Sequence, residues 1–318
     1  MSSFVLDLLE GEHPAEVALA HTGGALSLAV ELGHPVLSVA VVGRSGAPTL
    51  VLGATQHAGR VLDLEACARS KTSVLRRTTT GTAVALDGGL VVALAVPEID
   101  ALFDDATPKN AVNRYVRPLL HGLRACKIPA MYLGREWIAA DRRPIGVLGL
   151  EGSLDSALVL ELFITASGSL AVPRELATPL ERGLDRYRGK APLSLDEALR
   201  GAPAASLVEP FVEGVARAVS MEPATHEASS AQVVFIEEVT RTTSPIDDGA
   251  KFLAPIEVPI GYLDVARTSL GVWVGGDALT TTSALGFSSE LALETTTPLE
   301  GCLWSDLRRA RELAAQFS

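Results

Sequence analysis

The stretch RRTTTGTAV at residues 76–84 lies between a short strand-like segment, residues 73–75, and a longer apolar run, residues 89–96. Apolar runs bounded by turn residues indicate buried strands, so the stretch is predicted to be a loop between two of them. Its two arginines offer fixed hydrogen-bond donors, and its small residues let backbone N–H groups come close to a bound group. The pattern predicts a loop that receives an anionic group, although it carries a single glycine.

The composition is that of a large folded chain. Its 318 residues are 47% hydrophobic and 20% charged, which is enough to bury one large core, or one large core and a small one. The formal net charge of −11 argues against a protein that coats nucleic acid, because phosphate binding requires clustered Lys and Arg. Cys67, Cys126 and Cys302 are few and lack metal-ligand spacing, so we expect a reduced, intracellular chain without a metal site.

The sequence also predicts that the protein has no membrane partner. No apolar run reaches the roughly 18 to 20 residues that a membrane span needs. The first ten residues contain Asp7 and Glu10 and no basic lead, unlike a secretory signal. A cytoplasmic location is therefore expected.

Upstream of the loop, residues 15–32 are predicted to form a helix that is interrupted at Gly23-Gly24. Residues 36–42 and 49–52 are short apolar runs separated by a turn signal, so they are predicted to form a β-hairpin. Residues 63–70 are a candidate short helix that leads into the loop.

Downstream of the loop, residues 110–124 carry the clearest helical pattern, which Pro118 is expected to kink or divide. The basic residues of this helix are interpreted as a solvated face, with the docking of an acidic partner as the alternative. Strands are predicted at 129–133, 137–140, 144–150 and 158–165, and helices at 173–184, 195–199 and 207–219.

Strands followed by helices indicate an α+β fold. We predict a mixed β-sheet flanked by helices, with a small α+β C-terminal domain. The polar segment 221–231 is interpreted as a linker, which predicts domains at residues 1–222 and 232–318. In the second domain, strands are predicted at 233–239, 256–265 and 269–274, and a terminal helix at 305–317.

Four stretches, taken in order, resemble the lipoate–protein ligase A family, which is related to the catalytic domains of biotin protein ligases. The resemblance covers most of residues 15–220 and extends more loosely to the C-terminus, where residues 299–304 resemble the family's small accessory domain. The first stretch is PTLVLGATQ at 48–56, which is similar to a family strand that ends in a Gly and a Gln beside the substrate. The second is loop 76–84, similar to the family's RRxSGGGAV, and the third is residues 134–137 with 141–146, similar to GRNDLVVDGRKISG. The fourth is residues 187–190 with 193–199, similar to a loop and short helix of the family.

The family joins lipoate to ATP as lipoyl-adenylate and passes the lipoyl group to a lysine of an acceptor domain. The resemblance therefore implies lipoate as substrate, ATP with magnesium, and a lipoyl-domain acceptor as partner. It also implies an apolar tunnel for the acyl chain, which we expect around Leu50, Val84 and Ile145. The substrate- and adenylate-binding residues that it implies are Gln56, Arg76, Arg77, Thr79, Gly81, Ala83 and Lys190, the last as part of a lid.

The sequence departs from the family where the family carries its chemistry. Pro144 stands at the position of the reactive-site lysine, and proline offers neither a charge nor an N–H donor, so the catalytic residues are unknown. Arg142 could lie on the same strand face as position 144 and supply the missing charge. Thr80 and Thr82 replace neighbours of the loop glycine, and β-branched residues disfavour positive φ, so a change of loop shape is expected. Glu136-Trp137 replace Asn-Asp and bring a carboxylate near the expected phosphate site.

Several alternatives remain open. Arg76 and Arg77 could pair with acidic neighbours such as Asp87 or Glu65 instead of a ligand, and Lys190 could simply be solvated. The protein could be a catalytically silent family member, a pseudoenzyme that binds a small carboxylic acid or a partner protein, or a subunit that completes a site with another chain. A further alternative is an octanoyltransferase, which needs a reactive cysteine; Cys126 is more typical of a small buried hydrophobe.

Overall fold

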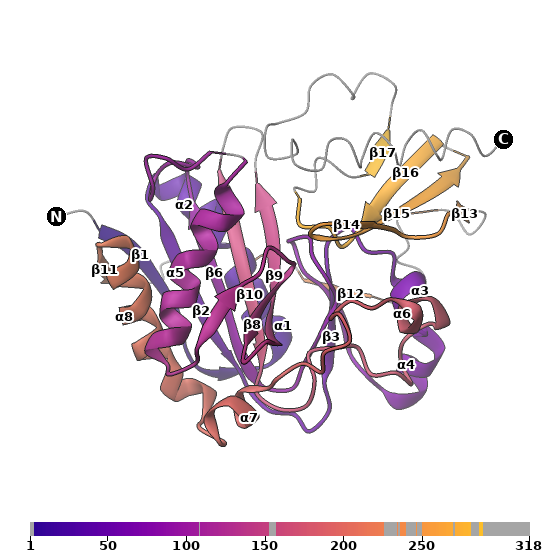
Figure 1. The fold of residues 1–318 in the computed structure, drawn as a ribbon, viewed down its shortest axis with the longest axis horizontal. Coiled ribbons are helices and arrows are strands. Elements are labelled where there is room, and N and C mark those ends of the chain that lie inside the picture. The colour runs from indigo at the N-terminus through magenta and orange to yellow at the C-terminus, as the bar shows by residue number, and fades with distance from the viewer. Residues whose placement is uncertain are drawn as a thin grey trace.

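A mixed sheet forms the centre of the protein in the computed structural model, which describes residues 3–107, 109–152, 157–225, 234, 236–239, 246, 250–269, 271–280 and 286–288. Within these residues the sheet has eight strands in the order β11-β1-β2-β6-β10-β9-β8-β7 (Figure 1). β1 pairs in parallel with β2 and β11, and the other neighbours pair antiparallel. The strands are β1 (Ser3–His13), β2 (Val36–Val42), β6 (Gly89–Val96), β7 (Ala130–Tyr132), β8 (Trp137–Ala140), β9 (Arg143–Gly152), β10 (Leu158–Thr165) and β11 (Glu222–Thr225).

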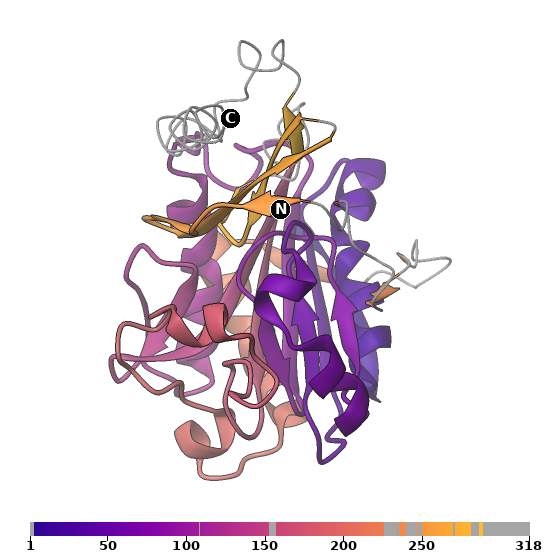
Figure 2. The ribbon, with the colours of Figure 1, turned by 90° about the vertical axis from the view of Figure 1, so that its right-hand side faces the viewer.

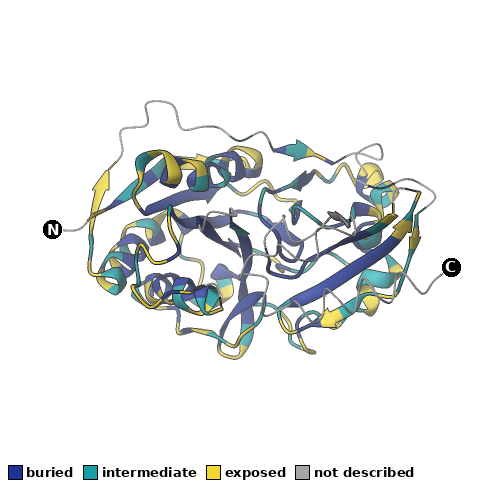
Figure 3. Ribbon diagram, turned by 90° about the horizontal axis from the view of Figure 1, so that it is seen from above, coloured by how far each residue is buried: buried dark blue, intermediate teal, exposed yellow. Residues whose placement is uncertain are grey.

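Helices cover both faces of this sheet (Figures 1 and 2). α5 (Ala111–Ala125) and α8 (Val208–Val219) pack on one face, and α1 (Ala15–Gly23) and α2 (Ala25–Leu32) pack on the other. Every residue of β2, β6 and β10 is consequently buried, which explains why these strands are continuous apolar runs rather than alternating ones. Figure 3 shows buried strands between helices whose outer surfaces are exposed.

A smaller sheet, in the order β12-β4-β3-β5, carries loop 76–84. Its strands are β3 (Thr49–Leu52), β4 (Val74–Arg76), β5 (Val84–Leu86) and β12 (Glu237–Glu238). Around it lie α3 (Ala58–Val61), α4 (Leu64–Ser70), α6 (Pro179–Gly183) and α7 (Leu195–Leu199), and the 3-10 helix η1 (Ala204–Leu207) precedes α8. Asp63 begins α4 because its carboxylate accepts a hydrogen bond from the N–H of Ala66 at 2.9 Å.

A third sheet, called here the C-terminal sheet, lies across the side of the molecule that carries loop 76–84 (Figures 1 and 2). Its described strands are β13 (Lys251–Phe252), β14 (Ile256–Val258), β15 (Gly261–Thr268), β16 (Gly271–Gly276) and β17 (Gly286–Ser288). Its contacts with the rest of the chain include the pair of Arg60 Nε and Asp264 Oδ1 at 2.8 Å and the Arg60 guanidinium 4.4 Å from the ring centre of Phe252. After β16, the hydroxyl of Thr80 donates to the carbonyl of Thr280 at 2.6 Å, and Leu279 packs in the main core.

The fold class is α+β, as predicted, but the predicted hairpin of residues 36–42 and 49–52 is wrong. Both segments are strands, yet β2 lies between β1 and β6 in the large sheet, whereas β3 pairs with β4 and β5. β2 has no free edge for β3. The strand partner that the sequence did not reveal is β1, whose Asp7, Glu10 and Glu12 hide its apolar residues.

Other element predictions also need correction. Pro118 does not divide α5, which is one helix of 15 residues, because packing of its apolar face offsets the lost backbone hydrogen bond. The predicted helix 173–184 is reduced to α6, since Ala177 forms a β-bridge with Leu62. The predicted strand 256–265 is the hairpin of β14 and β15, and part of the predicted linker is β11.

The C-terminal predictions stand differently. β12 pairs with β4 of the smaller sheet, although residues 237–238 were assigned to the second domain by sequence; the division into two domains stays a prediction. The predicted helix 305–317, residues 299–304 and Cys302 lie outside the described residues. None of the described helices is both long and apolar enough to cross a membrane.

The contact between α5 and α8 generates a stability prediction. A Cβ at Gly214 of α8 would lie 2.6 Å from the backbone oxygen of His121, which cannot move without distorting α5. We expect Gly214→Ala to lower the free energy of unfolding by about 1–3 kcal/mol, measured by urea denaturation. Gly183→Ala is the matched control, because a Cβ there meets nothing within 4 Å. Equal urea midpoints for the two variants would contradict this close packing.

Candidate binding site

Loop 76–84 is held against β9 by its backbone. The N–H of Thr80 donates to the carbonyl of Leu150 at 2.9 Å, and the carbonyl of Thr79 accepts from the N–H of Ala54 at 2.8 Å. Gly81 has a φ of 104°, and a Cβ there would lie 2.4 Å from the carbonyl oxygen of Leu148. The loop thus needs its single glycine, and its threonines avoid positive φ.

Arg77 is directed into the protein rather than toward a surface pocket. It is 2% exposed, its Nη2 donates to the carbonyl of Thr80 at 2.8 Å, and its guanidinium lies 4.5 Å from the ring centre of Phe163. Burial lowers the pKa of Arg77 to about 10, against the attraction of Glu161 and Asp277. Nη1 has no hydrogen-bond partner among the described residues. Arg77 therefore braces its own loop.

The neighbouring Arg76 forms an ion pair that the sequence did not predict. Its Nε lies 3.0 Å from Glu237 of β12, and its Nη1 donates to the carbonyl of Gln56 at 2.8 Å. The predicted partners are wrong for both arginines: Asp87 accepts from Ser167, and Glu65 lies beside Arg69. Glu237, which is 161 residues from Arg76 in the sequence, takes the place of the predicted local acid.

Thr79, predicted to bind the ligand, instead donates to a buried carboxylate. Glu161 of β10 accepts hydrogen bonds from the hydroxyls of Thr79 and Thr22. It is completely enclosed beneath the loop, and burial raises the pKa of its carboxyl despite these bonds. Thr79 is thereby tied to the interior of the sheet.

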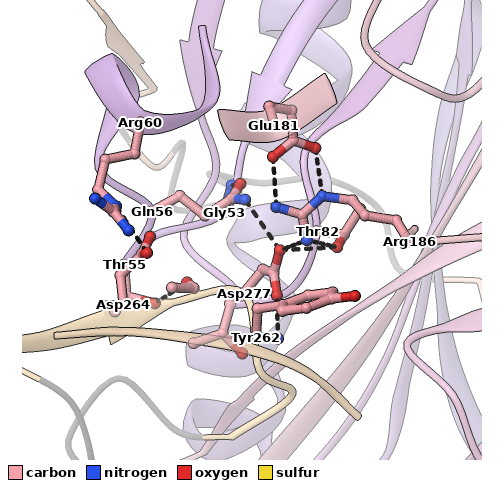
Figure 4. Close-up of polar contacts among 12 residues, drawn as sticks. Gly53, Thr55, Gln56, Arg60, Thr82, Glu181, Arg186, Tyr262, Asp264 and Asp277 are labelled. Carbon is pink, nitrogen blue, oxygen red and sulfur yellow. Dashed lines mark hydrogen bonds and ion pairs between the residues drawn. The ribbon is translucent and has the colours of Figure 1, made fainter. Parts of the chain in front are cut away.

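Arg186, which the sequence did not single out, lies at the centre of the site (Figure 4). Its guanidinium is paired with both carboxylate oxygens of Glu181, with Nη2 and Oε2 2.6 Å apart. On its other side it pairs with Asp277 of the C-terminal sheet, and it lies 5.2 Å from the ring centre of Tyr262. Burial lowers the pKa of Arg186, but the carboxylates of Asp277 and Glu181 raise it by more, so its pKa lies above the ordinary value.

The Asp277 carboxylate accepts hydrogen bonds from several parts of the chain. It is 1% exposed. Oδ2 accepts from Thr82 Oγ1 at 3.1 Å and from Gln56 Nε2 at 3.4 Å, besides its pair with Arg186. Oδ1 accepts from the N–H of Tyr262 at 2.6 Å. Gln56, which the sequence predicted beside the substrate, therefore meets a carboxylate of the protein itself.

Three buried polar atoms next to this cluster have no hydrogen-bond partner within the described part of the chain: Glu136 Oε2, Trp137 Nε1 and Tyr187 OH. Glu136 is 3% exposed. Burial raises its pKa from 4.5 to about 7, with Asp277 adding to the shift. Buried polar groups are seldom left unpartnered, so a binding function is one explanation for this concentration. The expectation that Glu136 brings a carboxylate near the site agrees with its proximity to Arg186 and Asp277.

A cavity of about 340 Å³ opens beside Arg186 and Tyr187, and its walls include the predicted residues Ala83 and Lys190. The remaining lining residues are either small or apolar, or charged: Ala171, Val172, Arg174, Ala177, Glu181, Arg182, Leu184, Asp185, Gly189 and Ala191. The structure thus separates the predicted site residues. Ala83 and Lys190 line the cavity, Gln56 contacts Asp277, and Arg76, Arg77, Thr79 and Gly81 lie behind it in loop 76–84.

The apolar tunnel was expected around Leu50, Val84 and Ile145, and it stays a prediction. All three are buried, but each packs in a different apolar cluster. Their side chains fill the core between the sheets and helices. The cavity beside Ala83 is a space that the structure offers.

The position of the missing lysine is buried, and Arg142 does not replace it. Pro144 pairs with Ala139 of β8, and its carbonyl accepts from the N–H of Leu193 at 2.6 Å. Arg142 occupies the exposed β8–β9 turn with Asp141, at φ values of 61° and 49°. The expectation that Arg142 shares a strand face with position 144 is wrong. Arg142 belongs to a two-residue turn with positive φ at both positions, and β9 begins only after it, at Arg143.

The described cysteines are inert in this fold. Cys67 and Cys126 are buried, and the thiol of Cys126 donates to the carbonyl of Leu207 at 3.4 Å. Burial raises the pKa of Cys126 to about 12 and also raises that of Cys67. A thiolate nucleophile, which octanoyl transfer would require, is disfavoured at both positions.

Sequence reasoning missed the ion-pair centre because its members are far apart. Asp277 is 91 residues from Arg186, so no local sequence pattern connects the two residues. Glu181 and Arg186 resemble an ordinary solvated pair in sequence. Only Tyr187 and Lys190, through the family-like stretch 187–190, pointed to this segment.

Comparisons with known proteins agree with the resemblance found in the sequence. Residues 41–152 match the family model described as the lipoyl protein ligase A/B catalytic domain. No curated protein sequence matches the chain. P. falciparum LipL1, solved in complex with lipoate, has a TM-score of 0.67 at 11% identity, over 99% of this chain and 99% of that one.

Two further structures cover less of the chain. A lipoate-protein ligase A bound with ATP has a TM-score of 0.55 at 16% identity, over 70% of this chain and 89% of that one. A bi-partite lipoate protein ligase of Thermoplasma acidophilum, solved in a study of this ligase and its E2 lipoyl domain, has a TM-score of 0.55 at 14% identity, over 71% and 88%. The lipoate–protein ligase resemblance is thereby confirmed, and the chain has the fold of these ligases.

The buried Glu136 predicts a pH dependence of stability. Its pKa in the folded protein, about 7, lies above the ordinary 4.5, so the folded state holds the proton more tightly than the unfolded chain does. Its stabilising contribution is complete below the lower value and is lost as the pH rises through the higher one. We expect Glu136→Gln to raise the free energy of unfolding at pH 8 by about 1–3 kcal/mol, with little change at pH 5.

The measurement is urea denaturation at both pH values, with Glu98→Gln as the control at an exposed position. The same difference between Glu136→Gln and the parent protein at pH 5 and at pH 8 would show that Glu136 does not titrate in this range.

Proposed function

We propose that this lipoate–protein ligase-like protein binds lipoate or a similar aliphatic carboxylic acid in the cavity beside Arg186, without activating it through ATP. The observation that carries the proposal is the cavity itself, whose walls include the family-predicted residues Ala83 and Lys190 together with Arg186 and Tyr187. The finding that P. falciparum LipL1 was solved in complex with lipoate on the same fold supports this class of ligand.

The walls of the cavity suit an acid with an apolar chain. Ala83, Ala171, Val172 and Leu184 contribute apolar surface to these walls. Arg186, Tyr187 and Lys190 contribute donors and positive charge. The volume of about 340 Å³ lies at the small end of the range of roughly 300–1,000 Å³ typical of ligand pockets. A compact aliphatic acid is therefore favoured over a bulky cofactor.

The residues present do not fit the phosphates of ATP with magnesium. Acid activation needs positive charge and N–H donors where negative charge develops. Here Pro144 replaces the reactive lysine. Arg77 donates to a carbonyl of its own loop, and the N–H of Thr80 donates to the carbonyl of Leu150. Glu136 adds a carboxyl to a centre that already holds those of Glu181 and Asp277. The proposal therefore contains no adenylation step.

A direct test is calorimetry of the full chain with lipoate, octanoate, biotin and ATP. We expect heat of binding with lipoate or octanoate and none with ATP. Tyr187→Phe is expected to weaken acid binding roughly tenfold, as for the loss of one hydrogen bond of about 1.4 kcal/mol. Its melting temperature should stay the same or rise, because the hydroxyl has no partner within the described protein.

The contrary outcome is equally definite. Tight ATP binding, together with a mass gain of a lipoyl domain incubated with lipoate, ATP, magnesium and this protein, would identify an active ligase and overturn the silent, acid-binding function. A positive-control ligase run in parallel verifies the acceptor.

A second candidate function is the binding of an acidic partner protein, such as a lipoyl domain. A groove of about 640 Å³ between α5 and β7 is lined by Arg114, Arg117, His121, Arg124 and Met131. Arg117 and His121 are exposed and β7 ends the large sheet among the described strands. This concentration of positive charge on a chain of net charge −11 favours an acidic surface opposite it.

This second function predicts that Arg117→Glu weakens the binding of an isolated lipoyl domain at least tenfold at low salt, measured by fluorescence anisotropy. Arg217→Glu, on the outer part of α8, is the charge-matched control and should leave binding unchanged. Equal effects of the two variants would reduce the groove to a solvated helix face.

A further inference from the structure

We propose that Gln56, Thr82 and Arg186 form a carboxylate seat for the ligand, and that Asp277 of the C-terminal sheet occupies this seat as an internal competitor. Ligand binding and the departure of Asp277 are then one exchange. This inference deepens the proposed function and rests on it for the identity of the incoming acid, whereas the seat itself is testable without that acid.

The donors around Asp277 have the arrangement of a receptor site. Oδ2 accepts from three side chains that belong to three separate segments: Thr82 at 3.1 Å, Gln56 at 3.4 Å, and Arg186. Only the N–H of Tyr262, which holds Oδ1 at 2.6 Å, comes from the C-terminal sheet itself. Figure 4 shows the three side chains converging on the Asp277 carboxylate. If Asp277 leaves, its donors in the rest of the chain remain behind.

Two further contacts hold the seat in shape without Asp277. Gln56 Oε1 accepts from the N–H of Gly53 at 2.9 Å, which turns the amide NH₂ of Gln56 toward the seat. Glu181 holds the opposite edge of the Arg186 guanidinium, with Nη2 and Oε2 2.6 Å apart. Nη1 is thereby left to face the incoming group. Arg186 also lines the cavity, so the seat adjoins the space proposed for the acyl chain.

The charges around the seat select a monoanion. Exchange of the Asp277 carboxylate for the carboxylate of a ligand leaves the formal charge of the centre unchanged. A phosphate dianion would add a negative charge close to Glu181 and to the buried Glu136, in a region of low dielectric where repulsion is strong. The seat therefore favours carboxylic acids over phosphates.

Asp277 directly follows β16, and polar contacts join this part of the chain to the rest of the protein around the seat. The N–H of Gly276, next to Asp277, donates to the carbonyl of Thr55 at 3.0 Å, and the Thr55 hydroxyl donates back to Gly276 at 3.0 Å. The Arg60–Asp264 pair lies further along β15. Withdrawal of Asp277 has to break these bonds, so in the protein without ligand Asp277 stays in the seat. The incoming acid must therefore compete with Asp277 for the same donors.

The first experiment tests the seat by chemical rescue, in the full chain and without a long-chain acid. Asp277→Ala removes the internal carboxylate and leaves Arg186 with a vacant position. We expect its melting temperature to fall, and formate or acetate to restore it by on the order of 2 °C or more relative to chloride at equal ionic strength. The parent protein and Glu257→Ala should respond alike to all of these salts. Glu257 is the matched control, because it is an acidic residue of β14 in the C-terminal sheet and its partner Arg188 lies outside the seat.

Equal effects of acetate and chloride on Asp277→Ala would overturn the seat, and inorganic phosphate rescuing better than acetate would overturn its preference for a monoanion. If Asp277→Ala does not fold, Asp277→Asn takes its place, with an amide that keeps the shape and loses the charge.

The second experiment tests competition. Calorimetry with octanoate and lipoate is expected to give at least tenfold tighter binding to Asp277→Asn than to the parent protein, with no change for Glu257→Gln. Weaker binding by Thr82→Val, which lacks the hydroxyl, is expected in both backgrounds. Unchanged affinity in Asp277→Asn would mean that Asp277 is only a structural ion pair. Successful rescue by acetate without any binding of octanoate or lipoate would instead keep the seat and overturn the proposed acyl ligand.

Discussion

The buried guanidinium of Arg186 is the group on which the arrangement of the site depends. It lies between Glu181, from its own segment, and Asp277, from the C-terminal sheet. A buried charge that loses one partner destabilises a protein by about 3–5 kcal/mol, so these three residues constrain one another strongly. Through Thr82 and Gln56 the same cluster holds loop 76–84 and the end of β3. One charge thus fixes the relative positions of the loop, the cavity and the C-terminal sheet.

Beneath this cluster, a second set of buried charges explains why loop 76–84 no longer resembles an open anion cradle. Arg77 donates to carbonyls of its own loop, and Thr79 donates to Glu161 in the centre of the sheet. Both residues keep the chemical character expected for anion binding but use it internally. These two residues are consequently bonded within the protein, while Thr82 of the same loop donates to Asp277. The arginine that faces carboxylates at this site is Arg186, in the segment after α6.

Periodicity and local chemistry were sufficient for many of the helices and strands, but not for the pairing of the strands. The apolar runs of β2, β3, β6, β8 and β10 are nearly continuous and bounded by turn residues, so these strands could be located from the sequence. The hairpin of β2 and β3 could not be excluded, because strand pairing depends on contacts distant in sequence. β1 escaped notice since its acidic residues interrupt the apolar pattern. The local signal of Pro118 was overridden by the packing of α5.

The sequence by itself determined the fold class, the family resemblance, the loss of the lysine at Pro144 and the two residues that line the cavity, Ala83 and Lys190. These follow from local pattern and residue chemistry. Only the tertiary structure decided which arginine faces a carboxylate, that Arg77 is enclosed, and that Asp277 reaches the centre from 91 residues away. The physical reason is that an ion pair requires proximity in space, and loop closure at so large a separation leaves no trace in the local sequence.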